Sequence, residues 1–139
     1  MAIEIRAGTE VPMEAVKRLY EIAGWWVPGA DEERLPRLVR GSFCFASAYD
    51  GGELVGIGRA ISDGASDAYI QDVMVRPDHR GLGIGSAIVA FLRDWCQGEG
   101  IAWIGLIAAP GTREFYDRLG FRAMEAHVPM LLGTPGTSR

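Results

Sequence analysis

Residues 72–86, which read DVMVRPDHRGLGIGS, join an apolar strand pattern to a glycine-rich turn and then to an amphipathic helix pattern. Glycine at positions 81, 83 and 85 lets the backbone curl tightly and approach a ligand without a Cβ in the way. The first N–H groups of the helix then point into the curl, and the helix dipole favours negative charge there. This stretch therefore predicts a site for a phosphate or pyrophosphate group.

The spacing of these glycines excludes two common phosphate-binding loops. A dinucleotide fingerprint would need glycine at position 86, which is Ser86, and a Walker loop would need a lysine, which the stretch lacks. What remains is Arg80-Gly-x-Gly-x-Gly85 after a strand end that reads Val-x-Val-x-Pro. This pattern resembles the acetyl-coenzyme A loop of the GCN5-related N-acetyltransferases (GNAT), which reads Gln/Arg-x-x-Gly-x-Gly/Ala.

Further stretches extend this resemblance over nearly the whole chain. Residues 115–121, FYDRLGF, are similar to the family's second signature, Phe-Tyr-x-x-x-Gly-Phe, and residues 50–56, DGGELVG, resemble its central hairpin. The run 23–25, AGW, together with Asp72-Val73, is similar to a small-amine subgroup that includes plant serotonin N-acetyltransferase-like proteins. The resemblance implies an acetyl-coenzyme A-dependent N-acetyltransferase, with acetyl-CoA as co-substrate.

The bulk composition fits one globular domain. The 139 residues are 48% apolar and 23% charged, with a net charge of −4, which gives no overall field for nucleic acid. No apolar run approaches the ~20 residues that cross a bilayer, and the start of the sequence lacks a signal-peptide pattern. Cys44 and Cys96 are isolated, with no Cys-x-x-Cys or histidine cluster. We therefore expect a cytoplasmic protein with no metal, nucleic-acid partner or membrane segment.

Hydrophobic periodicity predicts the order of the elements. Strands are expected at 3–6, 43–49, 54–61, 68–75 and 101–109, with one or two closing strands from Phe121. Helices are expected at 12–23, from 31 to about 41 as a helix made short or kinked by Pro36, from 86 to about 98, and at 112–119. A hairpin at 50–53 makes the central strands antiparallel, and the helix from 86 makes the strand at 101–109 parallel to the one before it.

The expected fold class is α/β, a single-domain sandwich at 1–132 with a mixed, mostly antiparallel sheet and helices on both faces. A flexible C-terminal tail is expected at 133–139. The GNAT resemblance adds that the strands before and after the glycine loop splay apart. It also implies that exposed terminal strands can pair two copies as a homodimer.

The resemblance assigns the cofactor-binding residues. The backbone of Val73, Met74 and Val75 should pair with the pantetheine arm. The N–H groups that should hold the pyrophosphate belong to Gly81, Leu82, Gly83, Ile84, Gly85 and Ser86. Arg80 occupies the Gln/Arg position of the motif, whereas Arg76 and His79 fit either a phosphate-binding cluster or a solvated turn. Many relatives have a pantetheine-binding asparagine where this chain has Ala109, which puts the detailed cofactor geometry in doubt.

Acetyl transfer to an amine needs a polarised carbonyl, a base for the amine and an acid for the departing thiolate. A backbone N–H of Met74 or Val75 is the expected oxyanion donor. Tyr116 is the candidate acid, because a phenol of pKa about 10 stays protonated at neutral pH, although it could also be a packing residue. Asp72, directly or through water, is the candidate base.

Asp72 has a competing structural interpretation. Simple alternation puts it on one face with Ile70 and Met74, where a carboxylate is costly unless it is paired or opens on a wet groove. It could be a base of raised pKa there, or it could form an ion pair with Arg59 on the neighbouring strand. A strand bulge would change the alternation, and the GNAT resemblance implies that one often occurs at this point.

The acceptor site is less well defined by the sequence. Trp25 and Trp26 could line it, or one of them could fill the core, and Asp63 is a weaker candidate for binding a cationic amine. A small primary amine is the expected acceptor, a peptide or protein amine the alternative, and a non-catalytic acetyl-CoA sensor the alternative of another class. Cys44 and Cys96 lie inside regular elements with no activating histidine beside them, so we expect direct transfer in a ternary complex.

Overall fold

The structure is a computed structural model that describes residues 2–133. Most of the expected tail, residues 134–139, lies outside the described residues. The chain divides into two compact units, residues 1–106 and 107–139, which are described separately below. No helix among the described residues combines the length and apolarity needed to span a bilayer.

The first unit contains a five-stranded sheet in the order β1-β2-β3-β4-β5. The strands are β1 (Ile3–Ala7), β2 (Cys44–Asp50), β3 (Glu53–Ser62), β4 (Asp67–Val75) and β5 (Trp103–Gly105). The first three pairings are antiparallel, and β4 and β5 are parallel. The predicted mixed, mostly antiparallel sheet is confirmed.

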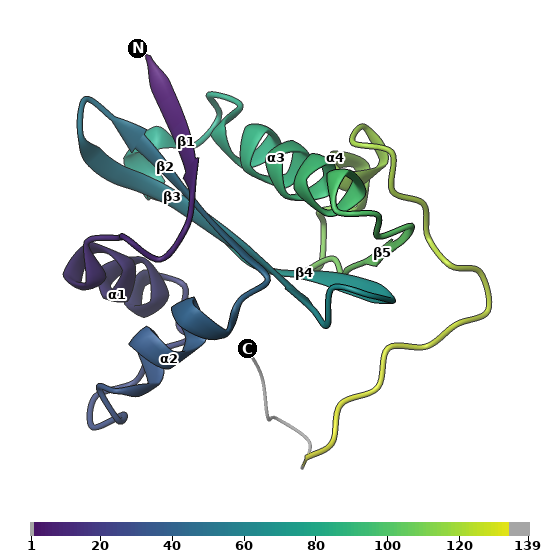
Figure 1. Ribbon diagram of the computed structural model, residues 1–139, viewed down its shortest axis with the longest axis horizontal. Helices are drawn as coiled ribbons and strands as arrows, with labels where there is room; N and C mark the ends of the chain where they lie inside the picture. Colours follow the sequence, from purple (N-terminus) through teal and green to yellow (C-terminus); the bar gives the residue numbers. More distant parts are fainter. Residues whose placement is uncertain (1, 134–139) are drawn as a thin grey trace. The chain divides into compact units, whose positions relative to one another are not determined.

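Helices cover both faces of this sheet, as expected. Figure 1 shows α1 (Met13–Ile22) and α2 (Arg34–Gly41) on one side and α3 (Ile84–Gly98) on the other. Pro36 lies in the first turn of α2, where its missing N–H has no helical partner to lose. The helix begins at Arg34, three residues later than expected, and ends at Gly41, so of the two expected forms the structure has the short helix.

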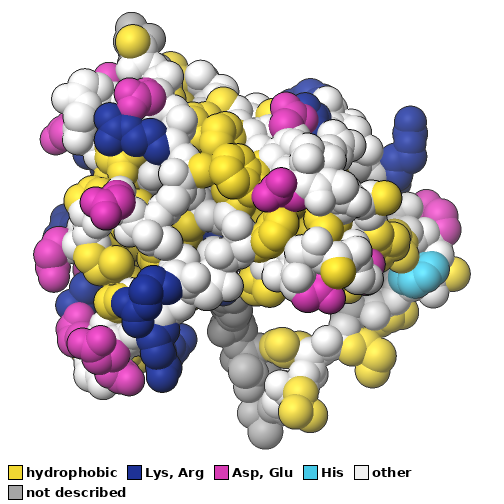
Figure 2. Space-filling view, in the orientation of Figure 1, with side chains coloured by type: hydrophobic (Ala, Val, Ile, Leu, Met, Phe, Trp, Pro, Cys, Tyr) yellow, Lys and Arg dark blue, Asp and Glu magenta, His cyan; other side chains and the backbone are white. Residues whose placement is uncertain are grey.

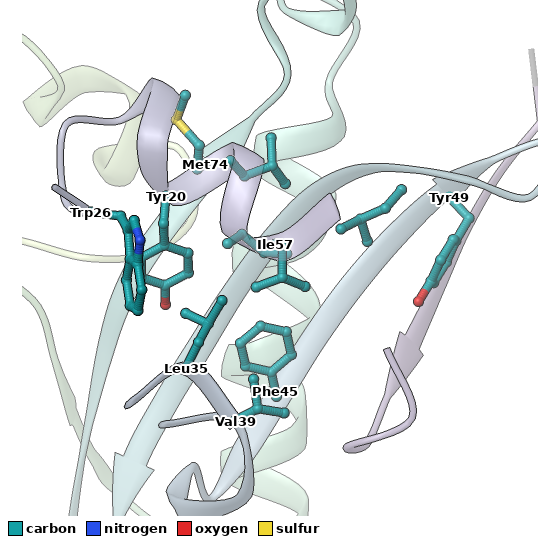
Figure 3. Close-up of a cluster of buried hydrophobic side chains, with 11 residues drawn as sticks. Tyr20, Trp26, Leu35, Val39, Phe45, Tyr49, Ile57 and Met74 are labelled. Atoms are coloured by element: carbon teal, nitrogen blue, oxygen red, sulfur yellow. The ribbon is translucent and has the colours of Figure 1, made fainter. Parts of the chain in front are cut away.

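A buried cluster joins α1 and α2 to the sheet (Figure 3). Its members are Val16, Leu19, Tyr20, Trp26, Leu35, Val39, Phe45, Tyr49, Leu54, Ile57 and Met74. Each large apolar side chain that is fully buried contributes about 1.5–3 kcal/mol. The cluster therefore fixes α1 against β3 and β4, the strands that carry the candidate site.

Two glycines of β3 explain how closely α3 packs on the opposite face. A Cβ at Gly56 would lie 2.8 Å from Ile88 Cδ1, and a Cβ at Gly58 would lie 2.7 Å from Ile88 Cγ2 and 3.0 Å from Leu92 Cδ1. Real Cβ atoms do not approach heavy atoms so closely. The absence of side chains at these two positions lets α3 lie directly on the backbone of β3.

The sequence patterns predicted longer and more numerous strands in the C-terminal part than the described residues form. β5 has only three residues instead of the expected nine, and it bonds to β4 alone. No strand follows Phe121 within the described residues, because Ala126 has a φ of 63° and Pro129 cannot donate a ladder hydrogen bond. The second unit contains α4 (Arg113–Asp117), which is shorter than the expected helix at 112–119.

Candidate functional site

The centre of the candidate site is a bulge in β4. Arg59 pairs with Gln71 and Ile57 pairs with Met74, so Gly58 alone lies opposite both Asp72 and Val73. Asp72 has a φ of 57°, a conformation that few non-glycine residues adopt. The bulge shifts the register by one residue, so the expected grouping of Asp72 with Ile70 is wrong. Asp72 does share the α1 side of the sheet with Met74, since Asp72 bonds Tyr20 and Met74 packs in the same cluster as Tyr20.

Residues on the two sides of this bulge face different helices. Met74 joins the cluster under α1 together with its partner Ile57. Ile70 pairs instead with Ala60, which shares a face of β3 with Gly58, and a Cβ at Gly58 would meet Ile88 and Leu92 of α3. The bulge thus lets β4 change the face that it presents just before the glycine loop.

The carboxylate of Asp72 is held by two side chains. Tyr20 of α1 donates its hydroxyl to Oδ2 over 2.8 Å, and Arg59 of β3 donates its Nε to the same oxygen over 2.8 Å. The Asp72 side chain is 4% exposed and that of Arg59 13%. The ion pair with Arg59, one of the two interpretations of Asp72, is thus present, and the tyrosine is a partner that the sequence did not reveal.

Beyond the bulge, β4 has a free edge. Its pairing with β5 covers only Asp67, Ala68 and Tyr69, which lie opposite Trp103, Ile104 and Gly105. Among the described residues, β5 ends opposite Tyr69, so residues 70–75 of β4 have no ladder partner on that side, and the expected splaying of the two strands stays a prediction. Val73, Met74 and Val75, the expected pantetheine-binding residues, all lie in this part of β4.

The glycine loop follows that edge and leads into α3. Gly81 has a φ of 77° and Gly83 a φ of 82°, both in the left-handed region, and a Cβ at either position would meet nothing within 4 Å. Gly83 is the N-cap of α3, and Ala87 makes the first helical bond, to the Gly83 carbonyl over 3.0 Å. The N–H groups of the first helical turn, at residues 84–86, have no carbonyl within the helix.

The helix begins at Ile84, two residues earlier than expected, so Gly85 belongs to its first turn. The combination of left-handed glycines, open space and unpaired helix amides is the arrangement that holds a phosphate group.

Arg80 ties the loop to the strand that precedes it. Its Nε donates to the Val75 carbonyl over 3.0 Å, and its guanidinium lies 3.6 Å from the sulfur of Met74. The motif arginine therefore braces the turn between β4 and the glycines.

The two other cations of the turn are paired with acids. Arg76 contacts Asp78 through two nitrogens, at 2.7 and 3.1 Å, and lies 3.5 Å from Glu53. His79 lies between Asp78 and Asp50, 2.9 Å from each. The hydrogen bonds from Arg76 and His79 lower the pKa of Asp78, and those to Asp78 and Asp50 raise the pKa of His79. Both basic side chains are thus held by neighbouring acids, and a role of this cluster in binding phosphate stays a prediction.

The two tryptophans differ in their surroundings. Trp26 is 8% exposed and lies beside Tyr20 in the core (Figure 3). Trp25 is partly buried, and its ring meets that of Tyr20 edge-on at 5.6 Å. Trp25 is thus linked to Asp72 through Tyr20. Asp63 lies in the turn before β4, where the N–H groups of Ala65 and Ser66 bond its carboxylate and lower its pKa.

Tyr116 lies in the second unit, on α4. Its ring packs edge-on against Phe115 at 4.9 Å and Phe121 at 6.0 Å, so the signature FYDRLGF folds into a small aromatic cluster. Burial raises the pKa of the Tyr116 phenol. Ala109, where relatives have asparagine, uses its carbonyl to accept the N–H and hydroxyl of Thr112.

Charge on the surface does not extend the site. On the face shown in Figure 2, basic and acidic side chains are interspersed over the part formed by α1 and α2. That part of the face therefore shows no patch of a single charge sign. No cluster of metal-ligating side chains occurs among the residues that the structure describes.

Comparison with known proteins decides the family. Residues 6–121 match the model of the acetyltransferase (GNAT) family. The chain belongs to the GNAT family. The resemblance drawn from the glycine loop and the Phe-Tyr-x-x-x-Gly-Phe signature is thereby confirmed.

Two curated relatives and one solved structure illustrate which proteins this GNAT chain is similar to. It is 32% identical over 120 residues to serotonin N-acetyltransferase 2, chloroplastic, of Oryza sativa subsp. japonica, covering 84% of this chain and 59% of that protein. It is 32% identical over 128 residues to histone acetyltransferase TAP1 of Glycine max, covering 84% of this chain and 54% of that protein. A GNAT family acetyltransferase of Streptococcus pneumoniae TIGR4 has a TM-score of 0.77 at 26% identity, covering 96% and 99%.

This GNAT chain spans between 39% and 59% of the length of the first curated relatives that it matches. Its fold agrees over almost its full length with the Streptococcus structure. The fold class is therefore shown for the whole chain, whereas the activity of the protein is a matter for proposal.

Proposed function

We propose that this GNAT chain transfers the acetyl group of acetyl-CoA directly to a primary amine. One observation carries the proposal: the free edge of β4 leads into a turn of left-handed glycines that ends at unpaired amides of α3. Coenzyme A has a pyrophosphate for those amides and an amide-rich arm for the strand edge. The family to which the chain belongs supports the same cofactor.

In this proposal the loop and strand position the thioester. The N–H groups of residues 81–86 bind the pyrophosphate, and the backbone of Val73 to Val75 pairs with the pantetheine arm as an added strand would. The N–H of Met74 or Val75 then donates to the thioester carbonyl oxygen. The end of β5 before these residues supports this role, because Met74 and Val75 pair with β3 on one side while β5 pairs only with Asp67 to Tyr69 on the other.

Proton transfers at both ends of the reaction are assigned to side chains. The amine nitrogen forms a bond to the thioester carbon, the carbon–sulfur bond breaks, and Tyr116 gives its proton to the departing sulfur. Burial raises the pKa of Tyr116, so the phenol is protonated at neutral pH and available as an acid. Removing such an acid typically lowers turnover by 10²–10⁴.

Asp72, acting through water, is the proposed acceptor of the amine proton. A water relay is needed because its side chain is 4% exposed and is bonded to Arg59 and Tyr20. The competing hypothesis is that Asp72 only fixes the bulge. A pH–rate profile separates the two: Asp72→Asn should remove an acidic limb if Asp72 is the base, and should lower the rate uniformly if it is structural.

The cysteines support direct transfer instead of an acetyl-cysteine intermediate. Cys44 is 3% exposed and Cys96 is fully buried. Burial raises the pKa of Cys44 to about 12 and also raises that of Cys96. Thiolate nucleophiles are therefore disfavoured at both positions.

A small primary amine is the proposed acceptor, supported by the name of the rice relative, a serotonin N-acetyltransferase. The soybean relative, named a histone acetyltransferase, favours a lysine side chain as the second candidate. A panel of acceptors at fixed acetyl-CoA, with serotonin and other small amines against lysine peptides, tests the choice by the rate of thiol release. Faster thiol release with lysine peptides than with small amines would make a lysine side chain the first candidate and a small amine the second.

The third candidate is an acetyl-CoA sensor without activity. Acetyl-CoA would bind to such a sensor and raise the melting temperature of the protein. No acceptor of the panel would then cause the release of thiol. Acetyl-CoA binding with acceptor-dependent thiol release is the outcome that the proposed function requires.

A further inference from the structure

A charged network joins the turn before the glycine loop to the hairpin between β2 and β3. Its centre is His79, in the short 3-10 turn η1 (Pro77–His79). Nε2 of His79 lies 2.9 Å from Oδ2 of Asp50, at the end of β2, and Nδ1 lies 2.9 Å from Oδ1 of Asp78. The side chain is 13% exposed, so the contact with Asp50 is largely shielded from solvent.

Both ring nitrogens of His79 thus face carboxylate oxygens. A neutral imidazole carries one N–H, so one of these contacts would set a nitrogen lone pair against a negative oxygen. Only the imidazolium donates to both. The geometry therefore favours the protonated ring, in agreement with the raised pKa.

The surrounding charges are shared among three elements. Asp50 belongs to β2, Glu53 to β3, and Arg76 and Asp78 to the turn after β4. Arg76 lies 3.5 Å from Nδ1 of His79 and opposes its charge, but two carboxylates contact the ring directly. With His79 protonated, two cations face three acids; with His79 neutral, Asp50 loses its charged partner.

The network also lies at the point where the loop is positioned. The Arg76 N–H donates to the Val55 carbonyl over 2.7 Å, which fixes the start of the turn to β3. Arg80 fixes the turn to Val75. His79 lies between these two anchors, and its side chain adds a third one, to Asp50 of β2. Gly81 and Gly83, the left-handed glycines of the loop, follow directly.

We propose that His79 is a positioning residue for the coenzyme loop: its bridge between Asp50 and Asp78 sets the glycines and the α3 amides to receive the pyrophosphate, and acetyl-CoA affinity falls when the bridge loses its proton. This inference rests on the proposed function, because it assigns a role in binding acetyl-CoA. It differs from a phosphate contact, since both nitrogens of His79 are turned to protein carboxylates.

The sign of the pH dependence follows from the raised pKa. The bridge is complete at pH values below the pKa of His79 in the folded protein and is lost as the pH rises through it. Between pH 7 and 9 the phosphate groups of acetyl-CoA do not titrate, since phosphate monoesters lose their second proton near pH 6. A fall in affinity over this range therefore reports on the protein.

Calorimetric titration with acetyl-CoA from pH 6.5 to 9 tests the proposal on three variants. We expect wild-type affinity to fall roughly fivefold as the pH rises, and His79→Gln to bind weakly with no such inflection. Asp50→Asn should move the inflection to lower pH. His127→Gln is the matched control: His127 is the second histidine of the chain, exposed and bonded to the Glu125 carbonyl, and its removal should leave the profile unchanged.

Kinetics supply a second readout. His79→Gln should raise the KM for acetyl-CoA while leaving kcat near the wild-type value, because a positioning residue does not touch the reacting atoms. NMR titration of the two histidine rings should place the pKa of His79 above its ordinary value and lower it in Asp50→Asn. This measurement needs no ligand and stays informative if His79→Gln does not fold.

The outcomes separate this inference from the proposed function. Acetyl-CoA binding with the same pH profile in wild type and both network variants would overturn the role of His79 and leave the proposed function intact. An ordinary pKa for His79 would overturn it as well. No binding of acetyl-CoA by the wild-type protein at any pH would overturn both.

Discussion

At the residue scale, the candidate site depends on Asp72, which has a φ of 57° and bonds both Tyr20 and Arg59. A carboxylate that is 4% exposed and accepts bonds from Tyr20 and Arg59 couples α1, β3 and β4 at a single oxygen. Removing one partner of a buried ion pair is costly because the other charge remains without compensation. Such a loss of stability would arise at the bulge, where the reaction is proposed to occur.

Arg59→Met should therefore destabilise the protein by about 3–5 kcal/mol, whereas Arg59→Met with Asp72→Asn should recover part of this loss. Denaturant unfolding of the two single variants and the double variant measures the coupling as a thermodynamic cycle. Additive losses would show that the pair contributes nothing of its own. Arg118→Met, which removes an exposed pair with Glu114, is the control and should cost at most ~1 kcal/mol.

Tyr116→Phe removes only the phenolic hydroxyl. Turnover should fall by about 10²–10⁴ if that hydroxyl protonates the departing thiolate, while the affinity for acetyl-CoA stays near the wild-type value. Steady-state thiol release and calorimetric titration measure the two quantities. A loss of affinity with unchanged turnover would assign Tyr116 to packing against Phe115 and Phe121 instead.

Gly83→Val places a β-branched residue at a φ of 82°, in the left-handed region that L-residues avoid. The cap of α3 should be displaced, and acetyl-CoA binding should be lost. Leu82→Ala is the matched control, because Leu82 is 55% exposed and its substitution leaves the backbone free to keep its conformation. Equal affinity of both variants would remove the loop from the cofactor site.

At the element scale, the contact between α3 and β3 determines where the loop ends. Gly58→Ala would place a methyl group 2.7 Å from Ile88, and we expect a loss of about 1–3 kcal/mol in the free energy of unfolding. Gly98→Ala, at the end of α3 with nothing within 4 Å, should be neutral or slightly stabilising. Thermal or denaturant unfolding compares the two. Equal stability would mean that α3 can move away from the strand at no cost.

The elements also show how far sequence patterns reach. The hairpin at Asp50-Gly-Gly-Glu53 and the helix after the glycine loop were predicted because turn chemistry and a 3.6-residue period are local signals. A bulge at Asp72 was expected only from the family resemblance and not from a local pattern, since it depends on pairing across the sheet with Gly58. β5 was predicted too long, because an apolar run such as 101–109 does not show whether a second strand bonds to it.

At the scale of the whole molecule, the candidate site was only partly readable. The glycines, Arg80 and the Phe-Tyr signature stand in motifs, so sequence alone placed them in the GNAT family. Tyr20 and Asp50 could not be found that way, because they reach Asp72 and His79 from residues 52 and 29 positions away. Asp78 could have been found from the sequence, because an acid two residues from Arg76 and next to His79 is a local pattern.

Calorimetric titration of the wild-type protein with acetyl-CoA tests the central claim most directly, with NADH and ATP as controls. The account predicts saturable, one-to-one binding of acetyl-CoA, weak or absent binding of the controls, and loss of binding in Gly83→Val but not in Leu82→Ala. Equal binding of all three nucleotides, or no binding of acetyl-CoA, would contradict the claim that the β4 edge and the glycine loop form a coenzyme A site.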